Sequence, residues 1–223
     1  LSFCFSLQAS ALPINELNLQ VEVSGQGDTV VLFESGFGTG PEVWQPLVDL
    51  LPANVIAVRY ARAGTGQSPA HNPSTGMAQH LTDLAALAQQ VGRGKKLILV
   101  GHSYGGLLAT EYARQHSAEL YGLLLIDPAV MQQRHWFKAA DAKAVAAEDV
   151  MLSKIMPPTL LPQFQQLNRD LDQAAQQVTA LPSDLKTVLL TSTRVEAEPF
   201  AFVETAAGKQ QWLRLHQALF AEV

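Results

Sequence analysis

The feature that most constrains the fold is a regular alternation of short apolar runs with segments whose apolar residues recur at helical spacing. The runs are continuously apolar, which is typical of strands buried on both faces of a parallel sheet. The alternation therefore predicts an α/β fold, with helices on both faces of a mostly parallel sheet. Strands are expected at 17–23, 29–35, 54–60, 97–101, 120–127 and 186–193, and helices at 43–51, 77–91, 104–116 and 200–222.

The alternation stops between residues 128 and 184. This segment is rich in Ala, Gln and Leu, contains several prolines and shows no obvious strand. We expect it to form two or three helices inserted into the sheet domain. The predicted organisation is a core made of residues 12–127 and 185–223, with a helical insertion at 128–184.

The composition limits the possible functions. With 48% hydrophobic and 16% charged residues over 223 positions, the chain resembles an ordinary globular protein and not a disordered one. The formal net charge of −5 predicts no basic surface, so no nucleic-acid partner is expected. Cys4 is the sole cysteine, which excludes an intrachain disulfide and a cysteine metal site. Nothing in the sequence indicates a metal or another cofactor.

Residues 1–11, LSFCFSLQASA, are apolar and then small, and they end in Ala9-Ser10-Ala11. They resemble the end of a secretory signal peptide with its cleavage site, which predicts an exported protein. Loss of Cys4 with the signal would leave a cysteine-free chain, as suits an oxidising compartment. An N-terminal strand or an arbitrary start is the alternative. No other segment has enough consecutive apolar residues to span a membrane.

The stretch ILVGHSYGGLLATEYA, residues 98–113, carries the strongest chemical signal. Gly101-His102-Ser103-Tyr104-Gly105 lies between a predicted strand and a predicted helix, which is the context of the G-x-S-x-G nucleophile elbow. In this sharp turn the serine takes a strained backbone conformation and exposes its Oγ at a helix N-terminus, where the helix dipole favours negative charge. A serine that only caps the helix is the alternative. We predict that Ser103 is a catalytic nucleophile.

A carbonyl group attacked by Ser103 becomes an oxyanion, which needs hydrogen-bond donors fixed in advance. The backbone N–H of Tyr104, directly after the nucleophile, is one expected donor. The second is expected from the loop after strand 29–35, where the N–H of Phe37 has a glycine on either side. A plain glycine-rich turn is the alternative for this loop.

These motifs together resemble the α/β-hydrolase superfamily from about residue 17 to the end of the sequence. GHSYGG is the strongest match; ESGFG at 34–38 is similar to the family's H-G-x-G loop, with Glu34-Ser35 in place of His-Gly. RAGTGQS at 62–68 is similar to its D-x-x-G-x-G-x-S loop, with Ala61 in place of the aspartate. The resemblance implies an α/β-hydrolase fold in which residues 128–184 form a helical cap that shapes the substrate pocket. A serine nucleophile excludes the branches that use aspartate, the epoxide hydrolases and haloalkane dehalogenases.

The family's chain order implies an acid after the serine and a histidine after the acid. The acid orients the imidazole and stabilises its charged form. It commonly follows the strand after the cap, where Glu196 and Glu198 stand. The other known location is the end of the preceding strand, where Asp127 is expected near Ser103, although a structural aspartate at this turn is the alternative. Asp127, Glu196 and Glu198 all remain candidates.

The family's histidine lies on a loop after a further strand, beyond a helix such as 200–222. The sequence contains neither that strand nor a Gly-His pair after this helix. We therefore expect the sequence to stop some tens of residues short of the catalytic histidine. Among the histidines present, His71 and His135 could approach the site, whereas His102 is expected to point away from Ser103. His116 is expected at the far end of the helix after Ser103, and His80 and His216 are expected in surface or packing roles.

The sequence thus predicts an exported serine hydrolase of the esterase or lipase kind. It would cleave a small-molecule ester or amide through an acyl-enzyme on Ser103. An acyltransferase or peptidase of the same fold would form the same intermediate. A non-catalytic binding protein with this fold is the alternative from a different class. The sequence does not indicate the substrate or the oligomeric state.

Overall fold

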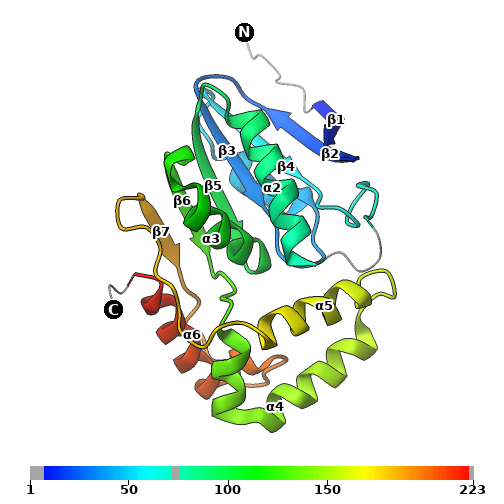
Figure 1. The fold of residues 1–223 in the computed structure, drawn as a ribbon, viewed down its shortest axis with the longest axis vertical. Coiled ribbons are helices and arrows are strands. Elements are labelled where there is room, and N and C mark those ends of the chain that lie inside the picture. The colour runs from blue at the N-terminus through cyan, green and yellow to red at the C-terminus, as the bar shows by residue number, and fades with distance from the viewer. Residues whose placement is uncertain (1–7, 72–75, 221–223) are drawn as a thin grey trace.

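The computed structural model describes residues 8–71 and 76–220 (Figure 1). Within these residues, seven strands form one sheet in the order β1-β2-β4-β3-β5-β6-β7. The strands are β1 (Gln8–Ile14), β2 (Leu17–Ser24), β3 (Thr29–Glu34), β4 (Val55–Tyr60), β5 (Lys96–His102), β6 (Gly122–Ile126) and β7 (Thr187–Leu190). β1 and β2 pair antiparallel to each other, and β2 pairs antiparallel to β4. All pairs from β4 to β7 are parallel, which confirms the mostly parallel sheet.

The strand order creates a switch point between β3 and β5. From β3 the chain continues to β4 on one side, and from β4 it returns across the sheet to β5 on the other side of β3. Parallel strands have their carboxyl ends at the same edge, and open α/β sheets bind ligands in the crevice outside that edge at such a point. The loops that follow β3 and β5 are therefore the first place to look for a site.

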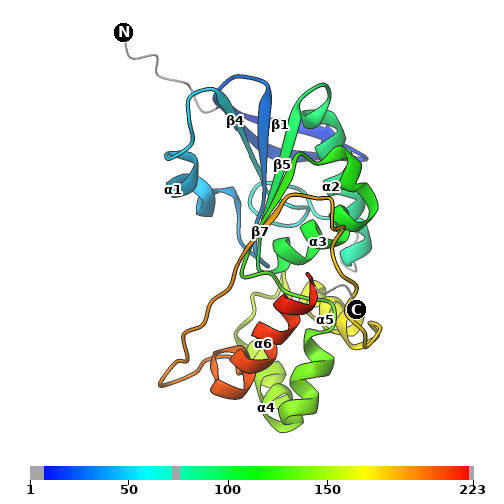
Figure 2. The same ribbon diagram turned by 90° about the vertical axis from the view of Figure 1, so that its left-hand side faces the viewer.

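Helices cover both faces of the sheet, as the apolar runs predict. α2 (Met77–Gly92) and α3 (Tyr104–His116) lie on one face, and η1 (Pro41–Trp44) with α1 (Gln45–Val48) lies on the other (Figure 2). Successive residues of β3 point to opposite faces, so Leu32 joins the core under α2 and α3 while Phe33 packs against Trp44. A short turn, η2 (Ser117–Glu119), links α3 to β6.

The segment after β6 forms a helical layer beyond the carboxyl ends of the strands (Figures 1 and 2). Its described residues contain no strand before β7 and form α4 (Gln133–Ile155) and α5 (Leu161–Asp172). α4 is kinked at Asp141, whose side chain accepts hydrogen bonds from the N–H groups of Lys143 and Ala144 and so begins a new helical run. Arg134 of α4 bonds both Asp149 and Asp172, which ties α4 to α5. The domain boundaries at 127/128 and 184/185 stay a prediction.

The structure differs from expectation at three element ends. The helix expected at 43–51 consists only of η1 and α1, which end at Val48. The helix expected at 200–222 divides into η3 (Phe202–Glu204) and α6 (Ala206–Ala218), because Thr205 caps α6 by accepting a hydrogen bond from the N–H of Gly208. The strand expected at 186–193 is shorter at both ends and leaves Thr191 and Ser192 free to face α6.

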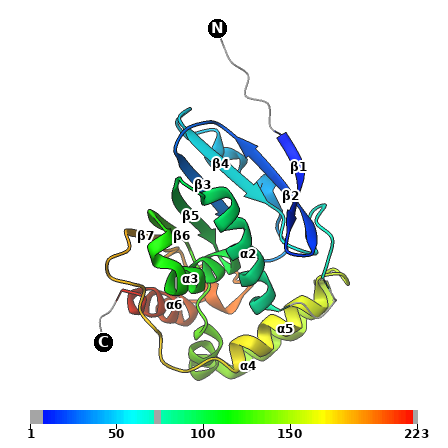
Figure 3. The ribbon, with the colours of Figure 1, turned by 45° about the horizontal axis from the view of Figure 1, so that its top comes forward.

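The signal peptide predicted at residues 1–11 lies partly within the described residues. Residues 8–11, taken from the sequence as the end of a signal peptide, belong to β1 and pair with β2 at the far edge of the sheet from β7 (Figure 3). Residues 1–7, with Cys4, lie outside the described part of the chain. The assignment of 1–11 to a signal peptide therefore stays a prediction. No helix in the described ranges is long and apolar enough to cross a membrane.

Candidate active site

Ser103 occupies the turn between β5 and α3 with φ 52° and ψ −120°. A positive φ is strained for a residue with a side chain and costs roughly 1–3 kcal/mol. The surrounding backbone enforces it, because the Ser103 N–H donates to the carbonyl of Ile126 at 3.2 Å and its carbonyl accepts from the N–H of Ala129 at 2.8 Å. The strained turn that the G-x-S-x-G motif predicts is therefore present. It is fixed by backbone hydrogen bonds to Ile126 and Ala129, which lie before and after Asp127 in the sequence.

Two glycines after Ser103 allow the neighbouring loops to approach the turn. A Cβ on Gly105 would lie 2.2 Å from the carbonyl oxygen of Glu34 and 2.4 Å from that of Ser35. A Cβ on Gly106 would lie 2.6 Å from the Cβ of Pro128. No side chain fits at either position, so the loops after β3 and β6 both pack directly against the first turn of α3.

The loop after β3 holds the second expected oxyanion donor. Ser35 anchors this loop, since its hydroxyl donates to the carbonyl of Gly40 at 3.2 Å and accepts from the indole N–H of Trp44 at 2.8 Å. The ring of Phe37 meets the ring of Tyr104 edge to face, with 5.7 Å between ring centres. Within residues 8–71 and 76–220, the Phe37 N–H has no hydrogen-bond acceptor. The Tyr104 N–H opens α3, where the first N–H groups have no intrahelical acceptor.

The helical layer covers this loop. The ring of Phe164 in α5 lies edge to face with Phe37, at 6.1 Å between ring centres. A Cβ on Gly38, which has φ +69°, would lie 2.9 Å from Cδ1 of Leu160, just before α5. α5 therefore covers the candidate oxyanion loop on one side, and α3 packs against it on the other.

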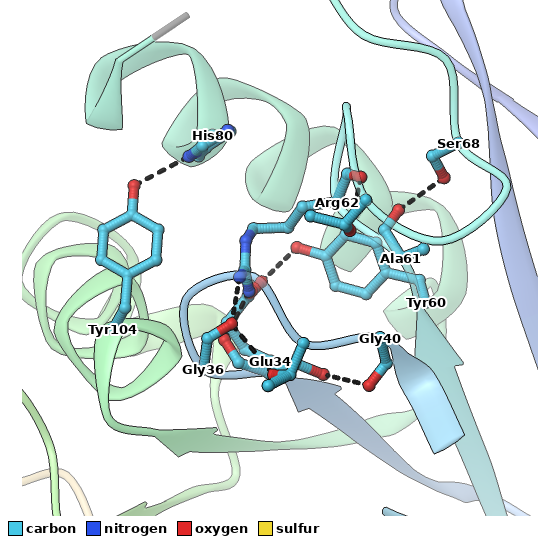
Figure 4. Close-up of polar contacts among 12 residues, drawn as sticks. Glu34, Gly36, Gly40, Tyr60, Ala61, Arg62, Ser68, His80 and Tyr104 are labelled. Carbon is cyan, nitrogen blue, oxygen red and sulfur yellow. Dashed lines mark hydrogen bonds and ion pairs between the residues drawn. The ribbon is translucent and has the colours of Figure 1, made fainter. Parts of the chain in front are cut away.

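A buried ion pair lies under the same loop (Figure 4). Arg62 follows β4, and its Nη1 lies 2.5 Å from the carboxylate of Glu34 at the end of β3. Tyr60 donates its hydroxyl hydrogen to the second carboxylate oxygen. Burial raises the pKa of Glu34, and the Arg62 charge opposes that shift. A sequence signal for this pair exists: Glu34 ends one apolar strand and Arg62 follows the next apolar strand by two residues, with opposite charges.

Tyr104 also connects the site to α2. Its hydroxyl lies 2.7 Å from Nδ1 of His80, which is buried. Burial, with the nearby positive charge of Arg62, lowers the pKa of His80 to about 3, so this imidazole is neutral at neutral pH. Burial also raises the pKa of the Tyr104 hydroxyl, which keeps it protonated.

Asp127 lies directly after β6 in a strained conformation, with φ 47°. Its Oδ1 accepts hydrogen bonds from the Ser192 N–H at 2.8 Å and from the Trp212 indole at 2.7 Å. Its Oδ2 accepts from the Ser192 hydroxyl at 2.7 Å, and Lys209 donates to that hydroxyl. Burial alone would raise the pKa of Asp127, but these hydrogen bonds and the Lys209 charge outweigh it and lower the pKa. The carboxylate is thus ionised and fixed beside the Ser103 turn.

The two glutamate candidates lie elsewhere. Glu196 is on the loop after β7, where its carboxylate pairs with Arg194 at 2.7 Å and its N–H donates to the carbonyl of Glu204. Glu198 is exposed two residues further on. This loop swings away from the sheet before η3 (Figure 2). In the described chain, neither glutamate side chain contacts the strained turn or Asp127.

The histidines have other partners. His71 pairs with Asp83 at 2.8 Å on the α2 side, and His135 is exposed and lines a surface hollow with Trp136 and Gln211. The structure thus does not bring His71 or His135 to the strained turn as hydrogen-bond partners. The remaining contacts are His80 with Tyr104, His116 with Glu119, His216 with Thr191 and the carbonyl of Pro128, and His102 against the Trp44 ring. None of these contacts, in the ranges that the structure covers, involves the Ser103 hydroxyl.

The described residues hold no cluster of three or more His, Cys, Asp or Glu side chains placed to bind a metal ion. At this edge of the sheet the structure brings together Ser103, the backbone N–H groups of Phe37 and Tyr104, the fixed carboxylate of Asp127 and the buried Arg62.

Comparison with known proteins places this chain in a family. The family described as the alpha/beta hydrolase family matches residues 30–221. The chain belongs to the alpha/beta hydrolase family. This confirms the fold class predicted from the strand pattern and the elbow motif. A candidate hydrolase from Agrobacterium vitis S4 superposes on 98% of this chain and 86% of its own, with a TM-score of 0.66 at 16% identity.

Curated proteins that resemble this chain include enzymes. The pimeloyl-(acyl-carrier protein) methyl ester esterase of Vibrio atlanticus is 33% identical over 162 residues, which are 71% of this chain and 55% of that protein. The lipase LipV of Mycobacterium tuberculosis is 34% identical over 115 residues, which are 51% of this chain and 43% of that protein. The chain spans about half the length of the curated relatives it matches.

Proposed function

We propose that the whole protein is a serine hydrolase that cleaves carboxylic esters through an acyl-enzyme on Ser103. One observation carries the proposal: Ser103 adopts φ 52° at a strand-to-helix turn, at the edge of the sheet beside the β3/β5 switch point. Backbone strain of this kind persists only where the surrounding structure enforces it, and it clusters at active sites. The ester specificity draws support from the relatives named as an esterase and a lipase.

The proposed reaction has two steps. The Ser103 Oγ bonds to the carbonyl carbon while its proton passes to a base, and the carbonyl oxygen becomes an oxyanion held by the N–H groups of Phe37 and Tyr104. The C–O bond to the alcohol then breaks, and the base returns the proton to the leaving oxygen. Water repeats the sequence on the acyl-enzyme, which releases the carboxylic acid and restores Ser103.

We propose Asp127, rather than Glu196 or Glu198, as the acid that orients the base. Asp127 is flanked by Ile126 and Ala129, whose backbone groups bond to the backbone of Ser103. Its three donors leave one lone-pair position of Oδ2 for a further hydrogen bond. Glu196 instead pairs with Arg194 on a loop that leads away from the sheet.

We infer that the proton acceptor is a histidine other than the six in this sequence. His71, His80, His116 and His216 bond to other groups, and His102 packs against Trp44. His135 is exposed on α4 and lines a hollow with Trp136 and Gln211. Activity measurements therefore require the full-length gene product. An acyltransferase or peptidase would use the same groups, so the acceptor and the acyl donor must be varied in the assay.

Labelling of the full-length protein with a fluorophosphonate tests the proposal. Ser103 should be the modified residue by peptide mass spectrometry, because only an activated hydroxyl attacks the phosphorus. Ser103→Ala should abolish both labelling and ester hydrolysis, while Ser183→Ala, at an exposed loop position, should change neither. Hydrolysis at the wild-type rate by a folded Ser103→Ala variant would contradict the serine mechanism. Absence of labelling and hydrolysis in the folded wild type would favour the binding-protein alternative.

A further inference from the structure

We propose that Arg62 is a positioning residue that aims both donors of the oxyanion hole. The inference rests on the proposed function, since it concerns how Phe37 and Tyr104 are held for an oxyanion on Ser103. Arg62 makes no contact with the reacting atoms in this role, and its effect passes through the backbone of the β3 loop.

The Arg62 guanidinium donates hydrogen bonds to two successive carbonyl groups, an arrangement that we call the Arg62 clamp. Its Nη1 donates to the carbonyl of Ser35 and its Nη2 donates to the carbonyl of Gly36. Figure 4 shows Arg62 reaching from the β4 loop to Gly36 beside Glu34. The planar fork of an arginine matches two neighbouring acceptors, which the single ammonium group of a lysine does not.

These two bonds orient the peptide N–H groups of the loop. A peptide bond is planar and trans, so each carbonyl points opposite to the N–H of the next residue. Because the carbonyl of Gly36 points at Arg62, the N–H of Phe37 points away from it. The clamp therefore fixes the direction of the expected oxyanion donor. Phe37 lies between Gly36 and Gly38, two residues that restrict backbone rotation little. The Gly36 carbonyl also accepts a hydrogen bond from the Thr39 hydroxyl at 3.1 Å, so Arg62 and Thr39 together set its direction.

The same guanidinium touches the other half of the hole. Its carbon atom lies 5.2 Å from the ring centre of Tyr104, close enough for a cation–π contact. Tyr104 supplies the second donor, and its ring also meets Phe37 and His80. One buried side chain thus contacts both segments whose N–H groups must converge on a single oxygen.

A buried cation needs compensation, and Glu34 supplies it. Arg62 is 4% exposed and Glu34 is 0% exposed. Burial alone would lower the pKa of Arg62, but the adjacent Glu34 carboxylate outweighs it and raises the pKa, so the clamp stays charged. Tyr60 occupies the remaining carboxylate oxygen. Burying this ion pair costs desolvation energy that an apolar pair of similar size would avoid. A role in positioning the oxyanion loop gives a reason for the pair to be present despite that cost.

Arg62→Met and Arg62→Lys in the full-length protein test this inference. Each variant is assayed for kcat and KM with a p-nitrophenyl ester, and for inhibition by a trifluoromethyl ketone, which forms a tetrahedral oxyanion on an active serine. Loss of one oxyanion donor typically lowers kcat by about 10²–10³-fold. We expect Arg62→Met to lower kcat about 100-fold with little change in KM, and to weaken the inhibitor by a similar factor. Arg62→Lys should show a smaller loss of both.

Arg59→Met is the matched control. Arg59 is 1% exposed on β4, three residues before Arg62. Its guanidinium pairs with Glu22 of β2 and Gln45 of α1 instead of the carbonyl groups of the loop after β3. Its replacement should lower the melting temperature without a change in inhibitor affinity.

The outcomes separate the two proposals. Wild-type inhibitor affinity and kcat in folded Arg62→Lys, or equal effects of Arg59→Met and Arg62→Met, would overturn the clamp. If Arg62→Met does not fold, the comparison rests on Arg62→Lys, which keeps the charge beside Glu34. Hydrolysis that survives Ser103→Ala would instead overturn the serine mechanism itself.

Discussion

At the scale of single residues, Asp127 offers the sharpest test. Asp127→Asn keeps the shape of the side chain but cannot stabilise an imidazolium, and the equivalent change in a Ser-His-Asp protease lowers kcat up to about 10⁴-fold. We expect a loss of that order in the full-length enzyme. Glu196→Gln should stay close to wild type, because that carboxylate pairs with Arg194 instead. The reverse ranking in steady-state kinetics would assign the acid to Glu196.

At single residues, the sequence is informative where a motif specifies the local backbone. The glycines around Ser103 predict a strained turn, which the structure shows, while the catalytic role of Ser103 stays a prediction. Arg62 was seen only as part of a loop motif, because a sequence does not show that its side chain crosses to β3 and reaches the carbonyls of Ser35 and Gly36. The contact between Arg62 and the β3 loop forms because β3 and β4 are neighbours in the sheet, and the residues around Arg62 in the sequence do not reveal that strand order.

At the scale of elements, the packing of α3 on the β3 loop makes a second prediction. Gly105→Ala would place a methyl group 2.2 Å from a backbone carbonyl oxygen that cannot move away without shifting the oxyanion loop. Overpacking of this kind costs about 1–3 kcal/mol of unfolding free energy, and ester hydrolysis should fall with it.

Gly122→Ala is the control for that substitution. Gly122 lies in β6, and an added Cβ would be 3.5 Å from the carbonyl of Lys186, an ordinary contact. Its unfolding free energy, measured in urea, should stay within about 0.5 kcal/mol of wild type. Equal stability and activity of the two variants would show that the loop after β3 is not packed tightly against α3.

Element ends were predicted less well than element types. The apolar runs located β2 to β7, and the signal is strongest for β3, which is buried on both faces. β1 was not separated from the signal-like segment. β1 is an edge strand with mostly exposed described residues, so its sequence carries little apolar pattern. The kink in α4 arises from the backbone bonds of Asp141, which apolar spacing does not reveal.

At the scale of the whole molecule, His80 makes stability depend on pH. Its pKa is about 3 in the folded chain and about 6.5 when unfolded. Between those values the unfolded chain binds the extra proton, so acidification from pH 6.5 destabilises the fold, by up to about 1.4 kcal/mol per pH unit. Charging is opposed structurally as well, because Nε2 of His80 has no acceptor among the described residues.

Urea unfolding at pH 7 and pH 5 measures this effect. His80→Gln removes the titrating group and should lose less stability on acidification than the wild type, whatever its stability at pH 7. His135→Gln changes an exposed histidine and should keep the wild-type dependence. Identical dependences in all three proteins would mean that burial of His80 does not govern acid stability.

Two of the three tryptophans give the molecule built-in optical reporters. The Trp44 indole donates to Ser35 at the start of the oxyanion loop, and the Trp212 indole donates to Asp127 on the other side of Ser103. Indole emission responds to a change in its hydrogen bond. Intrinsic fluorescence could therefore follow each side of the site during a single turnover, with no attached dye, and single-tryptophan variants would tell the two signals apart.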